Sequence, residues 1–139
     1  MHFGPSKADH SDAATYLRTA EAFRSRDLML VAETIHDDVV WHFPGTSWMA
    51  REVVGRGALL DYLREILERT ANTFLLEDLH IAATDHHLVA LQRVGATFDG
   101  HRQTFDIFSV MRYEAGRQIE RWFYAADLPA FEAFFSRFG

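Results

Sequence analysis

The sequence predicts an α+β domain in which helices come first and a run of antiparallel strands follows. Apolar residues recur at helical spacing near the N-terminus and again over 57–70, whereas 73–126 is rich in β-branched and aromatic side chains. Asp99-Gly100 and Gly116 divide the second region at positions typical of hairpin turns. The chain of 139 residues is long enough for a single domain over 1–139 with its own core.

Three helices are expected before the main strands. Residues 1–11 are expected to form a frayed polar lead-in. Ser11 or Asp12 can then cap the first helix. A short second helix is predicted over 27–36, and a third over 57–70. The apolar stripe of the third helix comprises Leu59, Tyr62, Leu63, Ile66 and Leu67.

Five main strands and a last helix are expected in the rest of the chain. Asp37-Asp38 is predicted to form a turn before the first strand, which Pro44-Gly45 ends, and 52–54 can add a short strand. The main strands are expected over 39–43, 73–83, 87–98, 104–113 and 118–126, and the last helix over 129–138.

The hairpin formed by the last two strands has two apolar faces. Alternation places Phe105, Ile107, Ser109 and Met111 together on one face of its first strand. In the second strand Trp122 and Tyr124 share one face, and Arg121 and Phe123 share the other. A sheet of this kind is covered on both sides, which predicts helices on one side and a second subunit on the other.

Composition restricts the class of function. The chain carries 20 acidic and 14 basic residues, a net charge of -6, without a basic cluster, which argues against nucleic-acid binding. It has no cysteine, so disulfides, thiolate catalysis and cysteine-ligated metals are excluded. No apolar run reaches the roughly 18–20 residues of a membrane span, and no signal peptide is recognised, so the cytoplasm is the expected location.

The eight histidines do not predict a metal site. His86 and His87 are adjacent, so their side chains diverge in an extended chain, and no zinc-binding spacing is present. We therefore expect neither a metal nor another cofactor.

Several short motifs occur in a defined order along residues 12–138. They are Asp27-Leu28, Asp37 to Trp41, Phe43 to Gly45, Gly55 to Gly57, Asp99-Gly100, Val110 to Tyr113, Gly116, Ile119 to Trp122 and Asp127. This order resembles the nuclear transport factor 2-like superfamily, and most closely its SnoaL-like, ketosteroid-isomerase-related branch. The resemblance implies a curved mixed or antiparallel sheet that wraps with three N-terminal helices and a short C-terminal helix into a cone. The pocket would lie inside the cone, and the open sheet face would serve dimerisation.

The catalytic carboxylates of three active groups in that superfamily are missing here. Where ketosteroid isomerases have their base and acid, this chain has Phe43 and Ser109. The aspartate of the SnoaL cyclases falls on Tyr124, and the Arg-x-Asp pair of limonene-type epoxide hydrolases becomes Arg93 with Gly95. Because each of those reactions needs a carboxylate that moves a proton, the resemblance does not transfer any of the three activities.

The alternation of side chains along the strands and the resemblance together predict an aromatic cavity with three polar groups, Arg93, Ser109 and Tyr124. The apolar lining is expected to comprise Trp41, Phe43, Phe105, Ile107 and Trp122, with Phe23 and Trp48 near the mouth. Such a cavity would bind a flat, largely apolar, oxygenated molecule, whose enolate-like or carboxylate oxygen Arg93 and Tyr124 would stabilise. Alternatively, Arg93 pairs with Asp106 or Glu120, and Ser109 is a small core residue.

Three further residues are candidates for acid–base chemistry. His42 alternates with Trp41 and Phe43, so it should face away from the cavity unless strand twist turns it inward. Asp106 should also face outward. Asp127 is placed to cap the last helix, with a catalytic role as the alternative.

Three functions remain open from the sequence. The first is a cofactor-free isomerase, cyclase, dehydratase or hydrolase acting on a hydrophobic metabolite, with Tyr124, His42, Arg93 and Asp127 as candidate catalytic residues. The second is a non-catalytic protein that binds a similar molecule. The third is an assembly module that forms a homodimer through the outer sheet face, expected to carry Asp106, Phe108, Val110, Arg121 and Phe123. A titratable group in the cavity would favour the enzyme. A closed aromatic cavity without such a group would favour the binding protein, and a cavity filled by tryptophan side chains would favour the assembly module.

Overall fold

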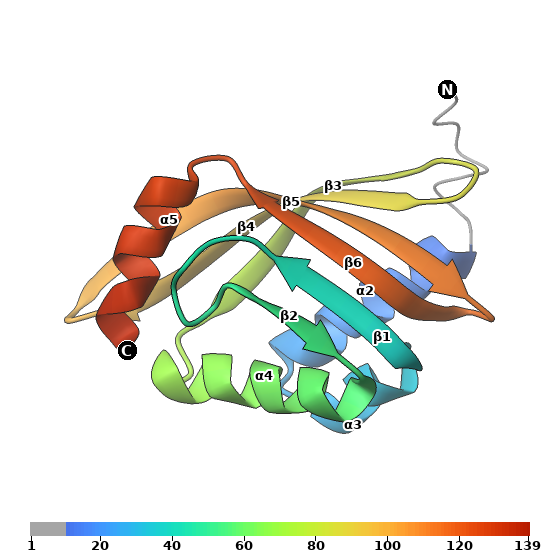
Figure 1. The fold of residues 1–139 in the computed structure, drawn as a ribbon, viewed down its shortest axis with the longest axis horizontal. Coiled ribbons are helices and arrows are strands. Elements are labelled where there is room, and N and C mark those ends of the chain that lie inside the picture. The colour runs from blue at the N-terminus through green and yellow to red at the C-terminus, as the bar shows by residue number, and fades with distance from the viewer. Residues whose placement is uncertain (1–10) are drawn as a thin grey trace.

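The computed structural model describes residues 11–139 and shows helices packed against one mixed sheet (Figure 1). The expected lead-in lies outside the described residues except for Ser11, which is already helical. The helices are α2 (Ser11–Arg24), α3 (Leu28–Glu33), α4 (Arg56–Arg69) and α5 (Leu128–Phe135), and a 3₁₀ turn follows over Ser136–Phe138. Their order and the α+β class agree with the expectation.

Within residues 11–139 the sheet has six strands, in the order β2-β1-β6-β5-β4-β3. They are β1 (Ile35–Phe43), β2 (Arg51–Val54), β3 (Leu75–Ala83), β4 (Leu88–Phe98), β5 (His101–Glu114) and β6 (Arg117–Ala125). β1 pairs in parallel with β6, and the other neighbours are antiparallel. The sheet is therefore mixed, and it is curved without closing into a barrel, as the resemblance implied.

The expected turn at Asp37-Asp38 is wrong, because β1 already begins at Ile35 and runs through these residues. The pairing of β1 with β6 changes register between Ile35 and Val40. The two aspartates lie in this irregular stretch and are exposed. The strand therefore tolerates polar residues that the sequence pattern assigned to a turn.

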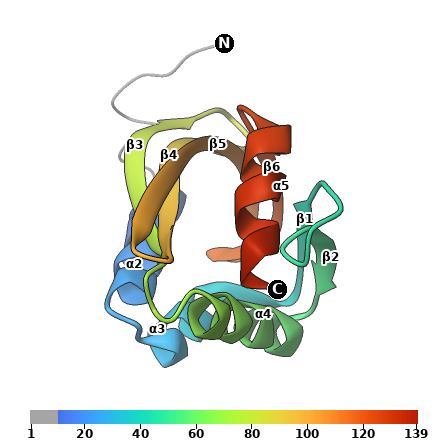
Figure 2. The ribbon, with the colours of Figure 1, turned by 90° about the vertical axis from the view of Figure 1, so that its left-hand side faces the viewer.

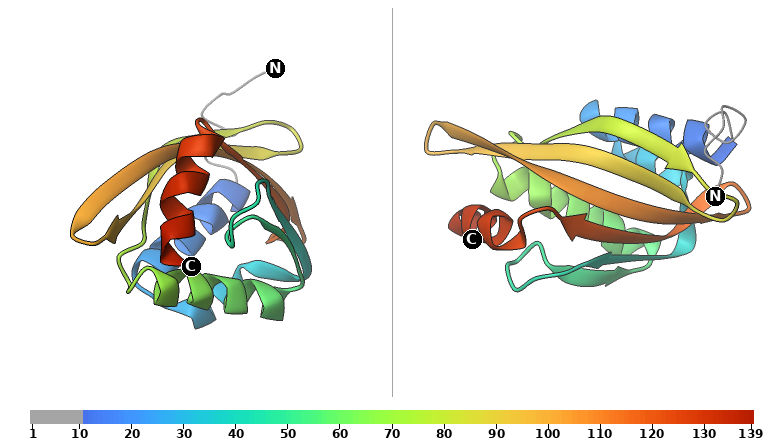
Figure 3. Two further views of the ribbon diagram at one scale, coloured as in Figure 1. Left: turned by 60° about the vertical axis from the view of Figure 1, so that its left-hand side comes forward. Right: turned by 90° about the horizontal axis from the view of Figure 1, so that it is seen from above.

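The sheet is curved, and helices lie on its concave side. Figure 2 shows the strands arching over the molecule, with α2 and α4 closing the opposite side and α5 lying across one end. Seen from above, the strands lie over α2 and α4 (Figure 3). Side chains from the concave face, the helices and α5 meet in the interior.

Helix α5 contributes an aromatic cluster to the core. Asp127 caps this helix, since its carboxylate accepts a hydrogen bond from the backbone N–H of Ala130 at 3.2 Å. The fully buried ring of Phe131 lies 5.3 Å from that of Phe43 and 4.6 Å from that of Phe135, measured between centroids. The predicted capping role of Asp127 is confirmed. Through the contact of Phe131 with Phe43, the aromatic cluster packs helix α5 against β1.

No helix within residues 11–139 is both long enough and apolar enough to cross a membrane.

We predict that Phe131→Ala lowers the free energy of unfolding by about 3–5 kcal/mol, because it leaves a cavity among packed aromatic rings. Urea denaturation followed by circular dichroism measures this change. Met29→Ala is the control, since Met29 is exposed on α3 and its truncation should change the unfolding free energy by less than about 0.5 kcal/mol. Equal effects of the two substitutions would contradict the packing role of α5.

Candidate functional site

A cavity of about 70 Å³ lies between the concave face of the sheet and the helices. Its wall is formed mainly by aromatic and aliphatic side chains from α2, α4, α5 and the inner face of the sheet. The aromatic members are Tyr16, Phe23, Trp41, Phe43, Tyr62, Phe74, Phe123 and Phe131. Among the described residues that line it, Arg121 is the only charged one.

Arg121 is a buried cation on β6, with only 4% of its surface exposed. Its Nη2 donates hydrogen bonds to Oε1 of Gln92 and to Oγ of Ser109, both at 3.0 Å. Its guanidinium carbon lies 4.5 Å from the ring centroid of Phe123 and 5.0 Å from that of Trp41. Neutral acceptors and aromatic faces thus surround the charge.

The hydrogen-bonding capacity of Arg121 is not used up by the protein. Its buried Nε has no hydrogen-bond partner within residues 11–139, and no carboxylate in that range forms an ion pair with it. A buried donor or charge without compensation is costly in a medium of low polarity. An oxygen atom of a bound molecule would therefore be stabilised at this point of the wall.

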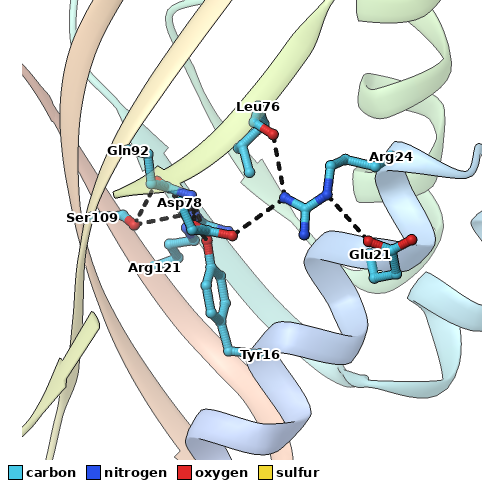
Figure 4. Close-up of polar contacts among 8 residues, drawn as sticks. All are labelled: Tyr16, Glu21, Arg24, Leu76, Asp78, Gln92, Ser109 and Arg121. Atoms are coloured by element: carbon cyan, nitrogen blue, oxygen red, sulfur yellow. Dashed lines mark hydrogen bonds and ion pairs between the residues drawn. The ribbon is translucent and has the colours of Figure 1, made fainter. Parts of the chain in front are cut away.

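A row of polar side chains crosses the inner face of the sheet (Figure 4). Asp78 on β3 lies opposite Gln92 on β4, and Gln92 Nε2 donates to Asp78 Oδ1 at 3.2 Å. The row continues diagonally to Ser109 on β5, whose Oγ donates to Gln92 Oε1 at 3.0 Å, and then to Arg121. Four neighbouring strands thus contribute one member each.

Tyr16 joins this polar row from helix α2. Its hydroxyl donates to Oδ1 of Asp78 at 2.6 Å and accepts a hydrogen bond from Nε2 of Gln92. Burial raises the pKa of Tyr16 above its ordinary value, and the Asp78 carboxylate adds to this effect while Arg121 opposes it. The hydroxyl therefore keeps its proton near neutral pH and acts as a hydrogen-bond donor.

Asp78 also faces a surface groove on the outside of the cavity wall. Its second oxygen, Oδ2, lies 3.4 Å from Nη1 of Arg24, which also donates to the backbone oxygen of Leu76 at 3.2 Å. The groove has a volume of about 630 Å³, and Arg24, Leu76 and Asp78 are among its lining residues. Asp78 therefore connects the interior row to the protein surface.

Four of the predicted ligand-binding residues lie in the cavity wall: Phe23, Trp41, Phe43 and Ile107. Ser109 is buried behind them and contacts Arg121. Phe105 packs instead on the rings of α5, and Trp48 donates a hydrogen bond to the backbone oxygen of Phe135 at 2.8 Å. Neither of these two residues lines the cavity.

The predicted inward orientation of Arg93, Trp122 and Tyr124 is wrong. Arg93 lies on the outer face, 45% exposed, with its Nε 3.0 Å from Oδ1 of Asp106. This is the ion pair that the sequence allowed as the alternative. The register of β5 with β6 places Tyr124 opposite the exposed Phe108, so Tyr124 is exposed as well. Trp122 follows the same parity and also lies on the outer face.

The same register overturns the expectation that Arg121 and Phe123 lie on the dimer face. Phe123 is opposite Ser109, which belongs to the inner face, so Phe123 and Arg121 point into the cavity. Arg121 gains its hydrogen bonds only there. On β4 it is Gln92, and not its neighbour Arg93, whose side chain points to the inner face.

His42 lies on the outer face, as strand alternation predicted. Its Nε2 is 2.8 Å from Oε2 of Glu120, and its Nδ1 is 3.3 Å from Oε2 of Glu52. Its ring stacks on Trp122 at an interplanar angle of 11°. His42 therefore does not reach the cavity, and Asp127, as the cap of α5, does not either.

Tyr16, Asp78 and Gln92 were not predicted as site residues from the sequence, and Arg121 was expected on the opposite face of the sheet. Two signals were available for these residues. Gln92 ends an apolar run over 88–91 in a predicted strand, and Tyr16 occupies the buried stripe of the first helix together with Ala20. Each signal marks a polar group in the interior, but neither identifies its partners.

Residues 16–122 match the SnoaL-like domain family. No match was found among curated protein sequences. The solved structure of Bal32a, from a soil-derived mobile gene cassette, is similar with a TM-score of 0.85 and 28% identity, covering 89% of this chain and 95% of Bal32a.

Two further solved structures share the fold at lower identity. A candidate SnoaL-like polyketide cyclase from Jannaschia sp. CCS1 has a TM-score of 0.76 and 14% identity, covering 98% of this chain and 97% of its own. An epoxide hydrolase of M. tuberculosis, similar to limonene epoxide hydrolase, has a TM-score of 0.72 and 17% identity, covering 95% and 91% of the two chains. At these identities the likeness supports the fold alone.

We predict that Tyr16→Phe weakens the loss of stability at alkaline pH. The folded-state pKa of Tyr16 lies above the ordinary value of 10.0, so the stability linked to this difference is present below pH 10 and is lost as pH rises above it. The unfolding free energy of the variant should therefore fall less steeply above pH 10 than that of the wild type. Urea denaturation at a series of pH values measures both slopes.

Tyr62→Phe is the comparison, because burial also raises the pKa of Tyr62, whose hydroxyl donates to the backbone oxygen of Met49. It should reduce the alkaline slope in the same direction. Identical slopes in the wild type and both variants would show that these hydroxyls ionise as freely in the folded state as in the unfolded state.

Proposed function

Because the chain belongs to the SnoaL-like family, within the nuclear transport factor 2-like superfamily, we propose that it is a cofactor-independent enzyme acting on a small, largely apolar, oxygenated metabolite. The observation that carries the proposal is Arg121, a buried cation with an unpartnered Nε in the wall of an aromatic cavity. The rings would hold the apolar part of the molecule, and Arg121 would bind its oxygen.

Arg121 is suited to an oxygen that gains negative charge during a reaction. Guanidinium donors that are already oriented in a site with little water stabilise a developing oxyanion strongly. Gln92 and Ser109 hold the guanidinium by two hydrogen bonds of 3.0 Å, so it needs little rearrangement. Isomerisation, cyclisation and dehydration next to a carbonyl share an enolate-like intermediate, which makes these the favoured reaction types.

A non-catalytic binding protein is the second candidate function. It is favoured by the outward positions of His42, Asp106 and Asp127, because none of these titratable groups reaches the cavity. The assembly module receives less support. Trp48 and Trp122 lie outside the cavity wall, so the tryptophans do not fill the hollow.

We predict that a thermal-shift screen finds a ligand whose binding depends on Arg121. The panel comprises steroids, polyketide-like phenols, terpenoid epoxides and small aromatic acids. A ligand at about 100 times its Kd adds about 2.7 kcal/mol of stability, which raises the melting temperature of a domain of this size by several degrees. Turnover of the hit, followed by chromatography, separates the enzyme from the binding protein.

Arg121→Gln should weaken binding of the hit by about tenfold to a hundredfold, since a hydrogen bond from a charged donor contributes about 1.5–3 kcal/mol. Arg93→Gln is the matched control, because it removes an arginine of the outer face and should leave the Kd unchanged. A hit that binds both variants equally, or a panel without any hit, would contradict the proposed site.

We also propose that the outer sheet face forms a homodimer with a second copy of the chain. Phe108 and Tyr124 are exposed there beside the partly buried Trp122, and the neighbouring Arg93–Asp106 pair adds no net charge. A face that is apolar and electrically balanced can pair with itself about a twofold axis. Asp106, Phe108 and Val110 remain expected contacts, whereas the buried Arg121 and Phe123 are not.

We predict that Phe108→Glu dissociates this dimer, because it places a charge in the contact without an opposite partner. Analytical ultracentrifugation should give the mass of two chains for the wild type and of one for the variant. Met29→Glu, on the exposed side of α3, should sediment as the wild type does. A wild-type protein that sediments as a single chain at micromolar concentration would contradict the proposed homodimer.

A further inference from the structure

We propose that Tyr16 and Asp78 form a proton relay that leads from the cavity to the surface groove. Tyr16 would take a proton from the substrate and pass its own hydroxyl proton to Asp78. This inference rests on the proposed function, because it supplies the proton acceptor that an enolate-forming reaction requires.

The relay is already aligned in the structure (Figure 4). Tyr16 is one of the residues that line the cavity, and its hydroxyl donates to Asp78 Oδ1 at 2.6 Å. Gln92 donates through Nε2 to both groups, which holds the hydroxyl oxygen and the carboxylate in one geometry. Asp78 is the one carboxylate within residues 11–139 to which a cavity-lining side chain donates a hydrogen bond.

The proposed step balances in bonds and charge. A C–H bond next to the substrate carbonyl breaks, and an O–H bond to Tyr16 forms. The original O–H bond of Tyr16 breaks in the same step, and an O–H bond to Asp78 forms. The electron pair of the C–H bond moves to the carbonyl oxygen. One negative charge is thus transferred from Asp78 to an oxygen that Arg121 can bind.

A relay suits Tyr16 better than direct base catalysis does. Burial raises its pKa above the ordinary value, so a tyrosinate in this site would be unfavourable. Transfer of both protons together keeps Tyr16 neutral throughout. The guanidinium carbon of Arg121 lies 5.3 Å from the centroid of the Tyr16 ring, so the donor for the oxyanion and the proton acceptor occupy the same end of the cavity.

The far end of the relay opens to solvent. The side chain of Asp78 is 10% exposed and pairs with Arg24, and both residues line the surface groove. The cavity and the groove share Leu76 and Val94 in their walls, so one layer of side chains separates them. A proton on Asp78 can exchange with water on the groove side while the substrate is still bound. The relay therefore predicts that hydrogen from solvent enters the substrate.

Deuterium incorporation into simple ketones tests this prediction. The probes are 2-tetralone, 2-indanone and cyclohex-2-enone, and proton NMR in deuterated buffer follows their exchange. The wild type should accelerate exchange of at least one probe above the buffer rate. Asp78→Asn and Tyr16→Phe should each reduce the accelerated rate at least a hundredfold, the lower end of the usual contribution of a proton-transfer group. The Kd of the probe should change by less than about threefold.

Two further variants separate proton transfer from a structural role. Asp78→Glu keeps the carboxylate and should restore part of the exchange rate that Asp78→Asn loses. Asp61→Asn removes an exposed carboxylate of helix α4 that lies neither in the cavity wall nor on the outer sheet face, and it should exchange the probes at the wild-type rate. Melting temperatures of all variants are measured in parallel. Where Asp78→Asn does not fold, Tyr16→Phe decides, because it removes only the hydroxyl.

The outcomes distinguish the relay from the proposed function. Exchange at the wild-type rate in Asp78→Asn or Tyr16→Phe overturns the relay, and so does the absence of catalysed exchange with all three ketones. A compound that binds in an Arg121-dependent manner without such exchange leaves the binding site standing. If no ketone and no compound of the ligand panel binds, the proposed function itself fails.

Discussion

The buried charge of Arg121 is the constraint on which the interior of this protein depends. A guanidinium among aromatic rings is tolerated only if neutral acceptors and ring faces compensate for the water that it has lost. Gln92 and Ser109 supply the acceptors, and Phe123 and Trp41 supply the ring faces. Asp78 and Tyr16 follow from this arrangement, because the side-chain amide of Gln92 also needs hydrogen-bond acceptors and donates to both of them. An interior that would otherwise be a plain aromatic core thereby acquires directed hydrogen-bond donors.

Charged side chains have different partners on the two faces of the sheet. On the outer face, charged side chains pair with one another in partly exposed positions, as Arg93 does with Asp106 and Arg112 with Glu120. Exposed pairs of this kind contribute little to stability and are already compensated. On the inner face a single cation has neutral partners and retains a free donor. This asymmetry is why we propose a role in binding or chemistry for the inner face, and a role in association for the outer face.

Helix α2 connects the interior to the surface. Tyr16 and Arg24 are eight residues apart, close to two turns, so both can approach β3 from the same side of the helix. One contacts Asp78 from the cavity side and the other from the groove side. The carboxylate is thus held between a buried hydroxyl and a partly exposed cation. In the proposed relay, this position would let the carboxylate exchange a proton with water while the aromatic wall stays closed around a bound molecule.

The sequence by itself determined the α+β order of elements, the family, the cap of the last helix and the faces of β5. These features depend on local chemistry, such as the carboxylate of Asp127 at a helix start or the positive φ of Gly116 in a hairpin turn. Alternation also separated Trp122 and Tyr124 from Arg121 and Phe123, but it could not tell which pair points inward. Only the tertiary structure decided that, because the register of β5 with β6 and the compensation of a buried arginine depend on residues distant in the chain.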